Sequence, residues 1–269
     1  MKIAVAGAGG RMGQALIEAT LGSDDLALGA ALDVAGSAML GRDAGERIGR
    51  SCGVVVGDDI EQALAQSVVL IDFTRPEGTL AHARHCARRG VGLVAGTTGL
   101  SSEQKAELAS HAASIPIVLA PNMSVGVNVL AKLVALAASR LGSAYDIEVV
   151  EMHHRHKVDA PSGTALMLGE AAATATSTTL DRSGVFAREG NTGPRKPGTI
   201  GFATLRGGDV VGEHTVVFAS EGERVELRHV ATSRNTFAAG ALRAARFVAN
   251  KRAASKPGFY TMSDVLELK

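Results

Sequence analysis

The 269-residue chain contains no tryptophan and only two cysteines, Cys52 and Cys86. Two thiols in a chain of this length are too few for a disulfide framework and are typical of a reducing compartment. Aromatic residues make up 3% of the sequence, so the cores must be aliphatic, and the hydrophobic fraction of 46% is large enough to build them. The N-terminal segment lacks the ordered regions of a secretory signal, so we expect a cytoplasmic protein.

An excess of charge of either sign is also missing. Lys and Arg total 28, and Asp and Glu total 27. General nucleic-acid binders and membrane-surface binders normally carry a clear basic excess. No uninterrupted apolar run reaches the roughly 18–20 residues of a membrane span. We therefore expect neither a nucleic acid nor a membrane as a partner, and any charge-driven recognition must be local.

Short apolar runs alternate with helical patterning through the first half of the chain. The runs are Lys2–Ala6, Leu26–Leu32, Gly53–Val56, Val68–Phe73, Val91–Ala95 and Ile115–Leu119. Helical patterning lies between most of them, over Gly13–Thr20, Gly78–Arg89 and Ser101–Ser114. Buried parallel strands read as continuous apolar runs, with helices crossing between them. The pattern predicts an α/β fold with a doubly wound parallel sheet.

The pattern changes near Pro121, where a second domain is predicted. Its expected elements are a helix over Val125–Leu141, a strand over Tyr145–Val150, a helix from Ser162 to about Ala173, a long loop over 176–198, and an antiparallel set formed by Ile200–Leu205, Glu213–Ala219 and Arg224–His229. A helix over Arg234–Asn250 follows. The predicted domains are residues 1–124 with a returning 234–269, and residues 125–233 with an open sheet.

Glycines and one acidic residue mark a nucleotide site in the first domain. Gly7, Gly10 and Gly13 directly follow the first apolar run, with the spacing of a dinucleotide-binding turn one residue longer than the six-residue form. Glycines permit a tight turn and close approach of a pyrophosphate, and the helix that follows offers free N–H groups. Arg11 can add a charge-assisted bond to a phosphate. Asp33 stands 20 residues after Gly13, where a carboxylate binds ribose hydroxyls.

The residue after Asp33 bears on the choice of cofactor. Sites that accept a 2′-phosphate usually offer an Arg here, but this chain has Val34, and the nearest basic residue downstream is Arg42. The sequence therefore favours NADH, with NADPH as the alternative. The turns Gly96–Gly99 and Ala120–Met123 follow later strands of the same sheet. They either contact the nicotinamide end or are ordinary turns.

Five consecutive basic or titratable side chains, residues 153–157 (HHRHK), form a local cluster that includes three of the chain's eight histidines. A metal site is disfavoured because no Cys, Asp or Glu completes a tetrahedral set at the usual spacing. A nucleic-acid track is disfavoured because the cluster is short and lacks interleaved aromatics. The remaining alternative is a solvated basic turn with no binding or catalytic role.

An anionic substrate fits this cluster best. A helix start at Pro161–Thr164 lies a few residues beyond Lys157, and its free N–H groups form an anion site. Lys157 and the histidines can hold a second anionic group and supply acid–base chemistry. Two anion sites a short distance apart suit a small dicarboxylate.

The chain resembles the dihydrodipicolinate reductase (4-hydroxy-tetrahydrodipicolinate reductase) family over nearly its whole length. The motifs that carry the resemblance are GAGGRMG at 7–13, DFTRPEGTL at 72–80, GTTG at 96–99, NMSVGVN at 122–128, EMHHRHKVDAPSGTA at 151–165 and IGFATLRGGDVVGEHTV at 200–216. The resemblance implies a Rossmann-type domain, a mixed α/β domain for substrate binding and tetramerisation, and a homotetramer. It also implies dehydration and reduction of a cyclic dicarboxylate in lysine and diaminopimelate biosynthesis.

The same resemblance implies roles for individual residues. His153 would be the acid/base histidine and Lys157 the proton donor, while His154, Gly163 and Thr164 would bind substrate carboxylates. The residues implied to line the cofactor site are Gly7, Ala8, Gly9, Gly10, Arg11, Met12, Asp33, Gly96, Thr97, Thr98, Ala120, Pro121, Asn122 and Met123. Two positions depart from other members: Val34 stands where some carry Arg, and Met123 stands where others carry Phe.

Three rival functions remain open at the level of the sequence. A different two-domain oxidoreductase would explain the first half but not the second. An aldehyde dehydrogenase that forms a thioester needs a positioned cysteine, and both cysteines fall in the nucleotide half. A non-enzymatic NAD sensor would need neither His153 nor Lys157.

Overall fold

The computed structural model describes residues 1–268 and divides the chain into two compact units. Unit 1 comprises Met1–Val125 and Arg234–Lys269, and unit 2 comprises Gly126–Ser233. The C-terminal segment thus returns to the unit in which the chain begins.

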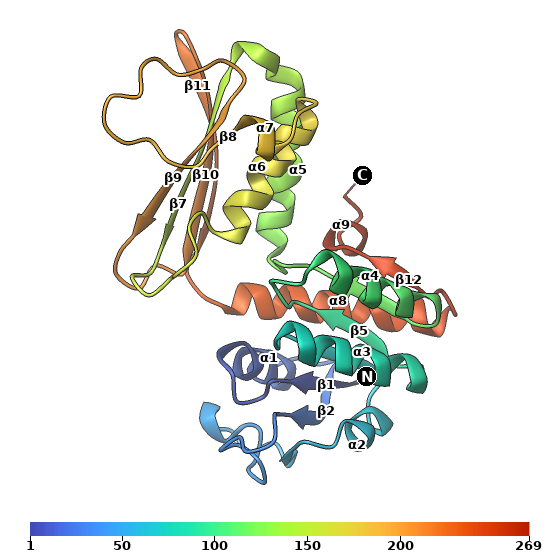
Figure 1. The fold of residues 1–269 in the computed structure, drawn as a ribbon. Coiled ribbons are helices and arrows are strands. Elements are labelled where there is room, and N and C mark those ends of the chain that lie inside the picture. Colours follow the sequence, from blue (N-terminus) through green and yellow to red (C-terminus); the bar gives the residue numbers. More distant parts are fainter. Residues whose placement is uncertain (269) are drawn as a thin grey trace. The chain divides into compact units, whose positions relative to one another are not determined.

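Unit 1 is built on a seven-stranded sheet in the order β12-β6-β5-β4-β1-β2-β3, in which every neighbouring pair is parallel. The strands are β1 Lys2–Ala6, β2 Ala27–Leu32, β3 Val56–Gly57, β4 Val69–Asp72, β5 Gly92–Ala95, β6 Pro116–Leu119 and β12 Gly258–Tyr260. This is the Rossmann-type parallel sheet that the alternating pattern predicted, and Figure 1 shows helices alternating with its strands.

Alternation of side chains along these strands supplies two cores, one on each face of the sheet. Ile3 and Val5 of β1 point into a core with buried residues of the helices α1 Arg11–Leu21 and α8 Asn235–Ala253. Ala4 and Ala6 point into the opposite core, against α3 Pro76–Arg89 and α4 Ser102–Ser110. Successive side chains of a strand face opposite sides, so a strand buried on both faces must be apolar throughout.

Local signals set the ends of these helices. Asp59 caps α2 Ile60–Ala65 through its side chain, and Ser101 with Gln104 forms a capping box at α4. α3 begins at Pro76 and stops at Gly90, whose φ of 64° suits glycine. α4 ends at Ser110 and is followed by a 3-10 turn, η2 His111–Ala113. The α-helix is therefore shorter than the predicted one, which ran to Ser114. A further 3-10 turn, η1 Glu46–Ile48, lies between β2 and β3.

The C-terminal residues, for which the sequence predicted no position, complete the same sheet. β12 pairs in parallel with β6 as the edge strand, and the short helix α9 Met262–Val265 follows it. Phe247 of α8 packs edge-on against Tyr260, with ring centroids 5.1 Å apart. The returning segment therefore supplies both a covering helix and a strand to unit 1.

Unit 2 holds a five-stranded mixed sheet in the order β11-β10-β7-β9-β8. Its elements are α5 Val125–Leu141 (whose first residue belongs to unit 1), η3 Gly142–Ala144, β7 Asp146–His153, α6 Gly163–Ala175, α7 Leu180–Ser183, β8 Gly184–Val185, β9 Ile200–Arg206, β10 Gly212–Ser220 and β11 Glu223–Ala231. α5 and α6 cover one face of this sheet (Figure 1), where their apolar residues share a core with alternate residues of the strands.

Two predictions for this unit were wrong. β10 and β11 pair antiparallel as predicted, but β9 does not belong to that set, because it runs parallel to β7 and is not paired with β10. The connection from β7 to β9 includes the helix α6, and a long helical crossover of this kind returns a strand in the parallel sense. Residues 176–198 are also not only loop, since they contain α7 and β8.

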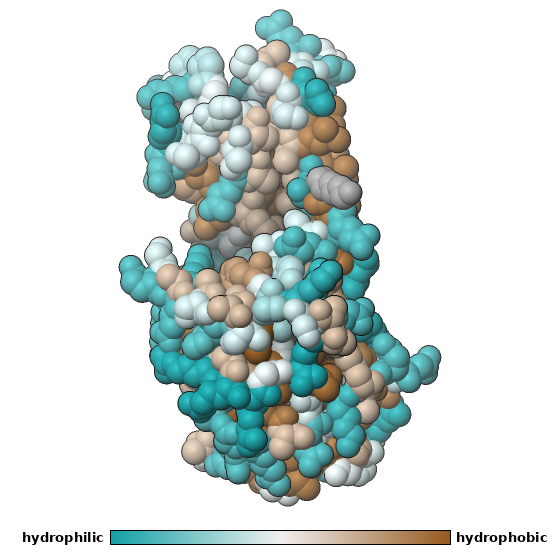
Figure 2. All heavy atoms as spheres, turned by 90° about the vertical axis from the view of Figure 1, so that its right-hand side faces the viewer, coloured by the Kyte–Doolittle hydropathy of each residue, from teal (hydrophilic) through white to brown (hydrophobic). Residues whose placement is uncertain are grey.

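Within residues 1–268, one helix is long and apolar enough to cross a membrane by length and composition alone. It spans Val125–Ala144, which is α5 with the 3-10 turn η3, and its mean hydropathy is 1.4. Length and composition alone do not distinguish a membrane span from the core helix of a globular unit. Four side chains of α5 are buried, Val127, Leu130, Val134 and Ala138, and three of these join the core of unit 2. Figure 2 shows apolar side chains at the surface as well, and Val129, Leu133 and Leu136 are among the exposed ones.

Close packing of α8 gives a stability prediction. A Cβ at Gly240 would overlap the backbone carbonyl oxygen of Met123, which cannot swing away. We expect Gly240→Ala to lower the free energy of unfolding by about 1–3 kcal/mol, the usual cost of overpacking, as measured by urea denaturation. Gly22→Ala is the matched control, because a Cβ there meets nothing closer than 3.6 Å and φ is −90°. Equal effects of the two variants would contradict the prediction.

Candidate active site

The glycine turn forms a cradle between β1 and α1. Gly7 has a φ of 74°, and the N–H of Gly10 donates to the Gly7 carbonyl at 2.9 Å. A Cβ at Gly13 would collide with the same carbonyl, so the helix can approach the turn this closely only with glycine. Gly10 is the N-cap of α1 and provides no side-chain cap. The first N–H groups of α1 thus remain available to a phosphate.

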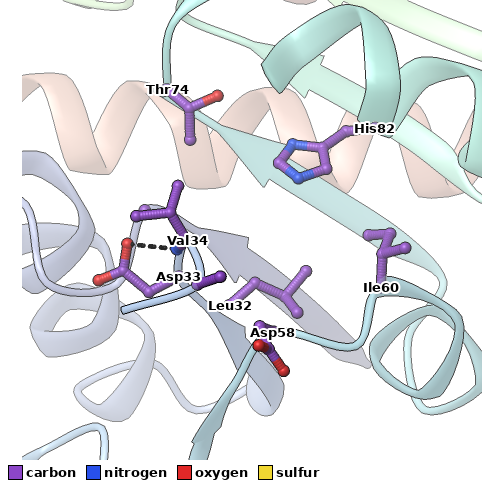
Figure 3. A pocket seen from close by; sticks show the side chains of 9 residues that line it. Leu32, Asp33, Val34, Asp58, Ile60, Thr74 and His82 are labelled. Carbon is purple, nitrogen blue, oxygen red and sulfur yellow. Dashed lines mark hydrogen bonds between the residues drawn. The ribbon is translucent and has the colours of Figure 1, made fainter. Parts of the chain in front are cut away.

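Asp33 lies directly after β2 and is tied to this turn. Its Oδ2 accepts hydrogen bonds from the Gly9 N–H at 2.9 Å and from the Ser37 hydroxyl at 2.7 Å. Beside it lies a cavity of about 300 Å³ (Figure 3), lined by Gly7, Leu32, Asp33, Val34, Ala35, Asp58, Ile60, Thr74 and His82. Val34, the residue after Asp33, is 72% exposed.

The basic residues near this carboxylate differ from those expected. Arg42 is paired with Glu46, with its Nε 2.8 Å from the carboxylate, and Arg11 is exposed at the start of α1. Arg47, which the sequence did not single out, donates from Nη1 to the Gly9 carbonyl at 3.0 Å. It lies 38 positions from Gly9 in the chain, so no local pattern reveals the contact.

The two later turns lie where parallel strands end, Gly96–Thr98 after β5 and Ala120–Met123 after β6. Within them the side chains of Thr97 and Met123 are buried, at 4% and 1% exposure. Thr97 Oγ1 lies 2.6 Å from the hydroxyl of Thr79. Thr98 and Pro121 are exposed. These turns therefore reach the same edge of the sheet as Gly7, but Thr97 and Met123 serve the packing of unit 1.

A buried aspartate at the end of β4 also belongs to this edge. Asp72 is fully buried, and its Oδ1 accepts from the backbone N–H and hydroxyl of Thr74 at 2.7 and 2.6 Å. Its Oδ2 lies 2.7 Å from Nδ1 of His82. Thr74 and His82 both line the cavity beside Asp33 (Figure 3), although neither was singled out from the sequence.

In unit 2, the basic cluster begins at the end of β7 rather than after it. His153 is the last residue of the strand and is 8% exposed. Glu151 lies on the same face of the strand and is 1% exposed. Its Oε2 lies 2.6 Å from His153 Nδ1 and accepts from Arg206 Nη1 at 2.8 Å. The structure therefore places a buried carboxylate behind the predicted acid/base histidine.

The same carboxylate reaches the predicted anion site. Oε1 of Glu151 accepts from the Ser162 backbone N–H at 3.0 Å and from Arg206 Nη2 at 3.0 Å. Ser162 is the N-cap of α6, and its hydroxyl accepts from the Ala165 N–H. Gly163 and Thr164 form the first turn of the helix. The structure thus connects His153 with Gly163 and Thr164 through Glu151 and Ser162.

The other cluster residues lie in the turn that follows β7. Lys157 Nζ is held by the Asp159 carboxylate at 2.7 and 2.9 Å. The His154 N–H donates to the Val210 carbonyl at 2.7 Å, while His156 is exposed. Among residues 1–268, no group of three His, Cys, Asp or Glu side chains is arranged to hold a metal ion.

Burial and charge set the protonation of the site. Burial lowers the pKa of His153, against an opposing contribution from the hydrogen bond to Glu151, so its imidazole is neutral near pH 7. Burial acts to raise the pKa of Glu151, but hydrogen bonds from Arg206 and His153 outweigh it and lower the pKa, so this group is a carboxylate. Burial lowers the pKa of His214, whose ring lies edge-on to His153 at 5.1 Å, to about 3.

Sequence reasoning singled out His153 and the helix start but not their structural neighbours Glu151, Arg206, His214 and Asp159. One signal for Glu151 was present. Alternation along β7 puts it on the same face as Ile147 and Val149, which are core residues. A carboxylate at an apolar position of a strand indicates a buried ion pair.

Comparisons with known proteins agree over the whole chain. A family model described as "Dihydrodipicolinate reductase, N-terminus" matches residues 1–123, and one described as "Dihydrodipicolinate reductase, C-terminus" matches residues 126–266. Two curated relatives, both named 4-hydroxy-tetrahydrodipicolinate reductase, are 56% identical. The Ralstonia nicotianae protein aligns over 268 residues and 100% of both chains, and the Nitrosospira multiformis protein over 100% of this chain and 98% of its own.

A solved structure has the same fold. Dipicolinate-bound dihydrodipicolinate reductase from Paenisporosarcina sp. TG-14 is similar with a TM-score of 0.74 at 24% identity, covering 97% of each chain. The Rossmann-type sheet and these matches define an oxidoreductase of the NAD(P)-binding class. Within that class, the chain belongs to the dihydrodipicolinate reductase family.

The low pKa of His214 gives a prediction about pH and stability. Its folded-state pKa of about 3 lies below the ordinary 6.5, so between these values the unfolded chain binds more protons. Stability therefore falls as pH drops through this window. We expect His214→Gln to reduce the slope of unfolding free energy against pH by up to about 1.4 kcal/mol per pH unit, measured by urea denaturation from pH 7 to pH 4. His156→Gln, on the exposed turn, is the control, and an unchanged slope in His214→Gln would contradict the assignment.

Proposed function

We propose that this chain catalyses the NAD(P)H-dependent reduction of 4-hydroxy-2,3,4,5-tetrahydrodipicolinate to 2,3,4,5-tetrahydrodipicolinate, with loss of water, in lysine and diaminopimelate biosynthesis. The observation that carries the proposal is the 56% identity to reductases of that name across the whole chain. Steady oxidation of NADH that depends on the cyclic substrate tests it. Binding of NADH without turnover would instead favour a sensor.

A nicotinamide dinucleotide fits the residues of unit 1. The cradle between Gly7 and Gly13 would be filled by any Cβ at Gly13, and it leaves the N-terminus of α1 to a pyrophosphate. Asp33 stands beside a cavity, where it would bind the adenosine ribose hydroxyls. When bound, the reduced nicotinamide supplies a hydride. Gly96–Thr98 and Ala120–Met123 would contact its far end.

Unit 2 would bind the dicarboxylate and handle protons. One carboxylate would lie at the first turn of α6, against Gly163 and the Thr164 hydroxyl, where helix N–H groups favour an anion. His154 would contact the substrate as well. His153, neutral and held by Glu151, would act as the acid/base group. Lys157, a cation paired with the exposed Asp159, would be the proton donor, since a substrate can displace that exposed partner.

We further propose that NADH is preferred to NADPH. A 2′-phosphate would meet the Asp33 carboxylate, and Val34 provides no guanidinium. We expect a higher kcat/KM with NADH when both cofactors are measured at the same ionic strength. A clear preference for NADPH would contradict the proposal. In that case Arg47, which already contacts the glycine turn, becomes the first residue to replace, with Arg47→Leu expected to lower only the NADPH value.

The two ends of the substrate site should respond differently to substitution. Lys157→Ala should lower kcat by about 10²–10⁴-fold, the usual contribution of general acid catalysis, and leave NADH affinity nearly unchanged. His153→Ala should act in the same direction. Thr164→Ala removes a hydrogen bond present in both ground and transition states, so KM should rise more than kcat falls. A Lys157→Ala enzyme with wild-type kcat would contradict the role of Lys157 as proton donor and would leave the cluster with substrate binding only.

We also propose a cytoplasmic homotetramer, in which the open face of the unit 2 sheet is covered by other subunits. Val150, Met152, Ala203 and Val217 share this face with Leu205, which is 45% exposed. A small sheet needs its apolar face covered. We expect light scattering to give the mass of four chains and Leu205→Glu to give smaller species. A monomeric wild-type protein at micromolar concentration would refute the assembly.

A further inference from the structure

A buried carboxylate lies behind the proposed acid/base histidine. Glu151 precedes His153 by two positions on β7, so both side chains project from the same face of the strand. Four hydrogen bonds surround the carboxylate, from His153 Nδ1 at 2.6 Å, Arg206 Nη1 at 2.8 Å, Arg206 Nη2 at 3.0 Å and the Ser162 N–H at 3.0 Å. A solvated carboxylate can be hydrogen-bonded by water, whereas a buried one must find its donors within the protein.

We propose that Glu151 is a positioning residue, which fixes the tautomer and orientation of the His153 imidazole and holds that imidazole in register with the first turn of α6. The proposal rests on the proposed function, because that function gives His153 its task. Glu151 itself need not touch the substrate.

The tautomer follows from the chemistry of the two groups. A carboxylate can only accept hydrogen bonds, so Nδ1 of His153 must carry the proton that it donates to Glu151. A neutral imidazole has one N–H, so Nε2 is left as a bare lone pair that can take a proton. Gly212 lies beside this nitrogen, since a Cβ there would approach Nε2 to 3.0 Å. A glycine at this position keeps that side of the ring uncrowded.

Arg206 makes the burial of this carboxylate tolerable. Its guanidinium binds both oxygens of Glu151 and also donates from Nη2 to the Asp159 carbonyl at 2.6 Å. The chain segment that carries Lys157 and Asp159 is thereby tied to the same carboxylate. Because Ser162 caps α6, Glu151 connects β7, β9, this segment and the helix start. A displaced carboxylate would shift the proposed base and the proposed anion site relative to each other.

Several charged or titratable groups lie around His153, and three of them act on its pKa. Glu151 on its own strand raises it, while Arg206 on β9 and Lys157 in the following segment lower it. His214 on β10 lies edge-on to the ring, and Asp159 pairs with Lys157. Removing the charge of Glu151 leaves burial and the two cations unopposed. The imidazole should then protonate only at lower pH.

The experiment compares Glu151→Gln with Glu148→Gln in the full-length enzyme. Glu148 lies on the same strand but on the opposite face, where it pairs with Arg188 and Arg195. We expect Glu151→Gln to lower kcat about 10²-fold, toward the lower end of what general acid–base catalysis contributes. The acid limb of its kcat/KM profile should move to lower pH. Glu148→Gln should leave both quantities unchanged, and light scattering should give the wild-type mass, which checks that this change on the proposed interface face does not alter assembly.

A measurement without substrate keeps this inference separate from the proposed function. Nitrogen-15 NMR of the ligand-free wild-type protein, with the His153 signal assigned through His153→Asn, should show the Nδ1–H tautomer. Glu151→Gln should lower the pKa of His153. If the wild-type enzyme does not turn over the cyclic substrate, the proposed function fails, while the NMR result still decides what Glu151 does to His153.

A second variant guards against loss of folding. Glu151→Met combined with Arg206→Met removes the ion pair without leaving an unpaired buried charge, which proteins usually tolerate. We expect native circular dichroism, a reduced kcat and loss of the fixed tautomer. A variant of Glu151 that folds and keeps wild-type kcat, the wild-type acid limb and the Nδ1–H tautomer would overturn the proposal.

Discussion

A carboxylate with 1% of its surface exposed must be surrounded by donors, and in unit 2 this requirement organises the site. Glu151 is held by a guanidinium from β9, an imidazole from its own strand and a backbone N–H from the start of α6. Each donor belongs to an element that also packs on the apolar core. A shift of β9 would take Arg206 away and leave the buried charge without its cation, which costs more than the ion pair itself contributes.

Unit 1 is organised by a different constraint, the close approach of backbone to backbone. The turn between β1 and α1 brings the helix start against the Gly7 carbonyl, and Gly240 of α8 meets the Met123 carbonyl in the same manner. These contacts leave no space for a Cβ. Both positions lie next to segments that are proposed to bind the cofactor, so packing and the proposed binding would depend on the same absence of side chains. A glycine pattern therefore carries structural information even before any ligand is considered.

The sequence predicted what depends on short-range periodicity. The helix Val125–Leu141 has the predicted bounds, and the six apolar runs correspond to six strands, five of them to within two residues at each end. The third is the poorest match, since β3 starts only at Val56. The edge strand β12 has three residues and no alternation to detect, because its place depends on pairing with β6 far along the chain. The parallel sense of β9 depends on the crossover through α6, which the composition of the strand does not encode.

The same limit explains which parts of the site could be predicted. His153, Lys157 and the helix start are close in sequence, so their pattern is visible within 12 residues. Arg206 lies 55 positions from Glu151, and His214 lies 52 positions from Ser162. Such partners are selected by strand register rather than by local spacing. The sequence can indicate that a carboxylate in an apolar face needs a cation, but only the fold shows which one.

Electrostatics connects this network to the substrate that unit 2 is proposed to bind. Glu151 raises the pKa of His153 through its hydrogen bond and its charge, but burial and the cations of Lys157 and Arg206 lower it, and the lowering prevails. A dicarboxylate at the first turn of α6 would add negative charge beside this ring and raise the pKa of His153. The imidazole would then bind a proton more readily with substrate present than without it. A buried, neutral base of this kind would gain basicity from the anion on which it acts, so its protonation would be coupled to occupation of the site.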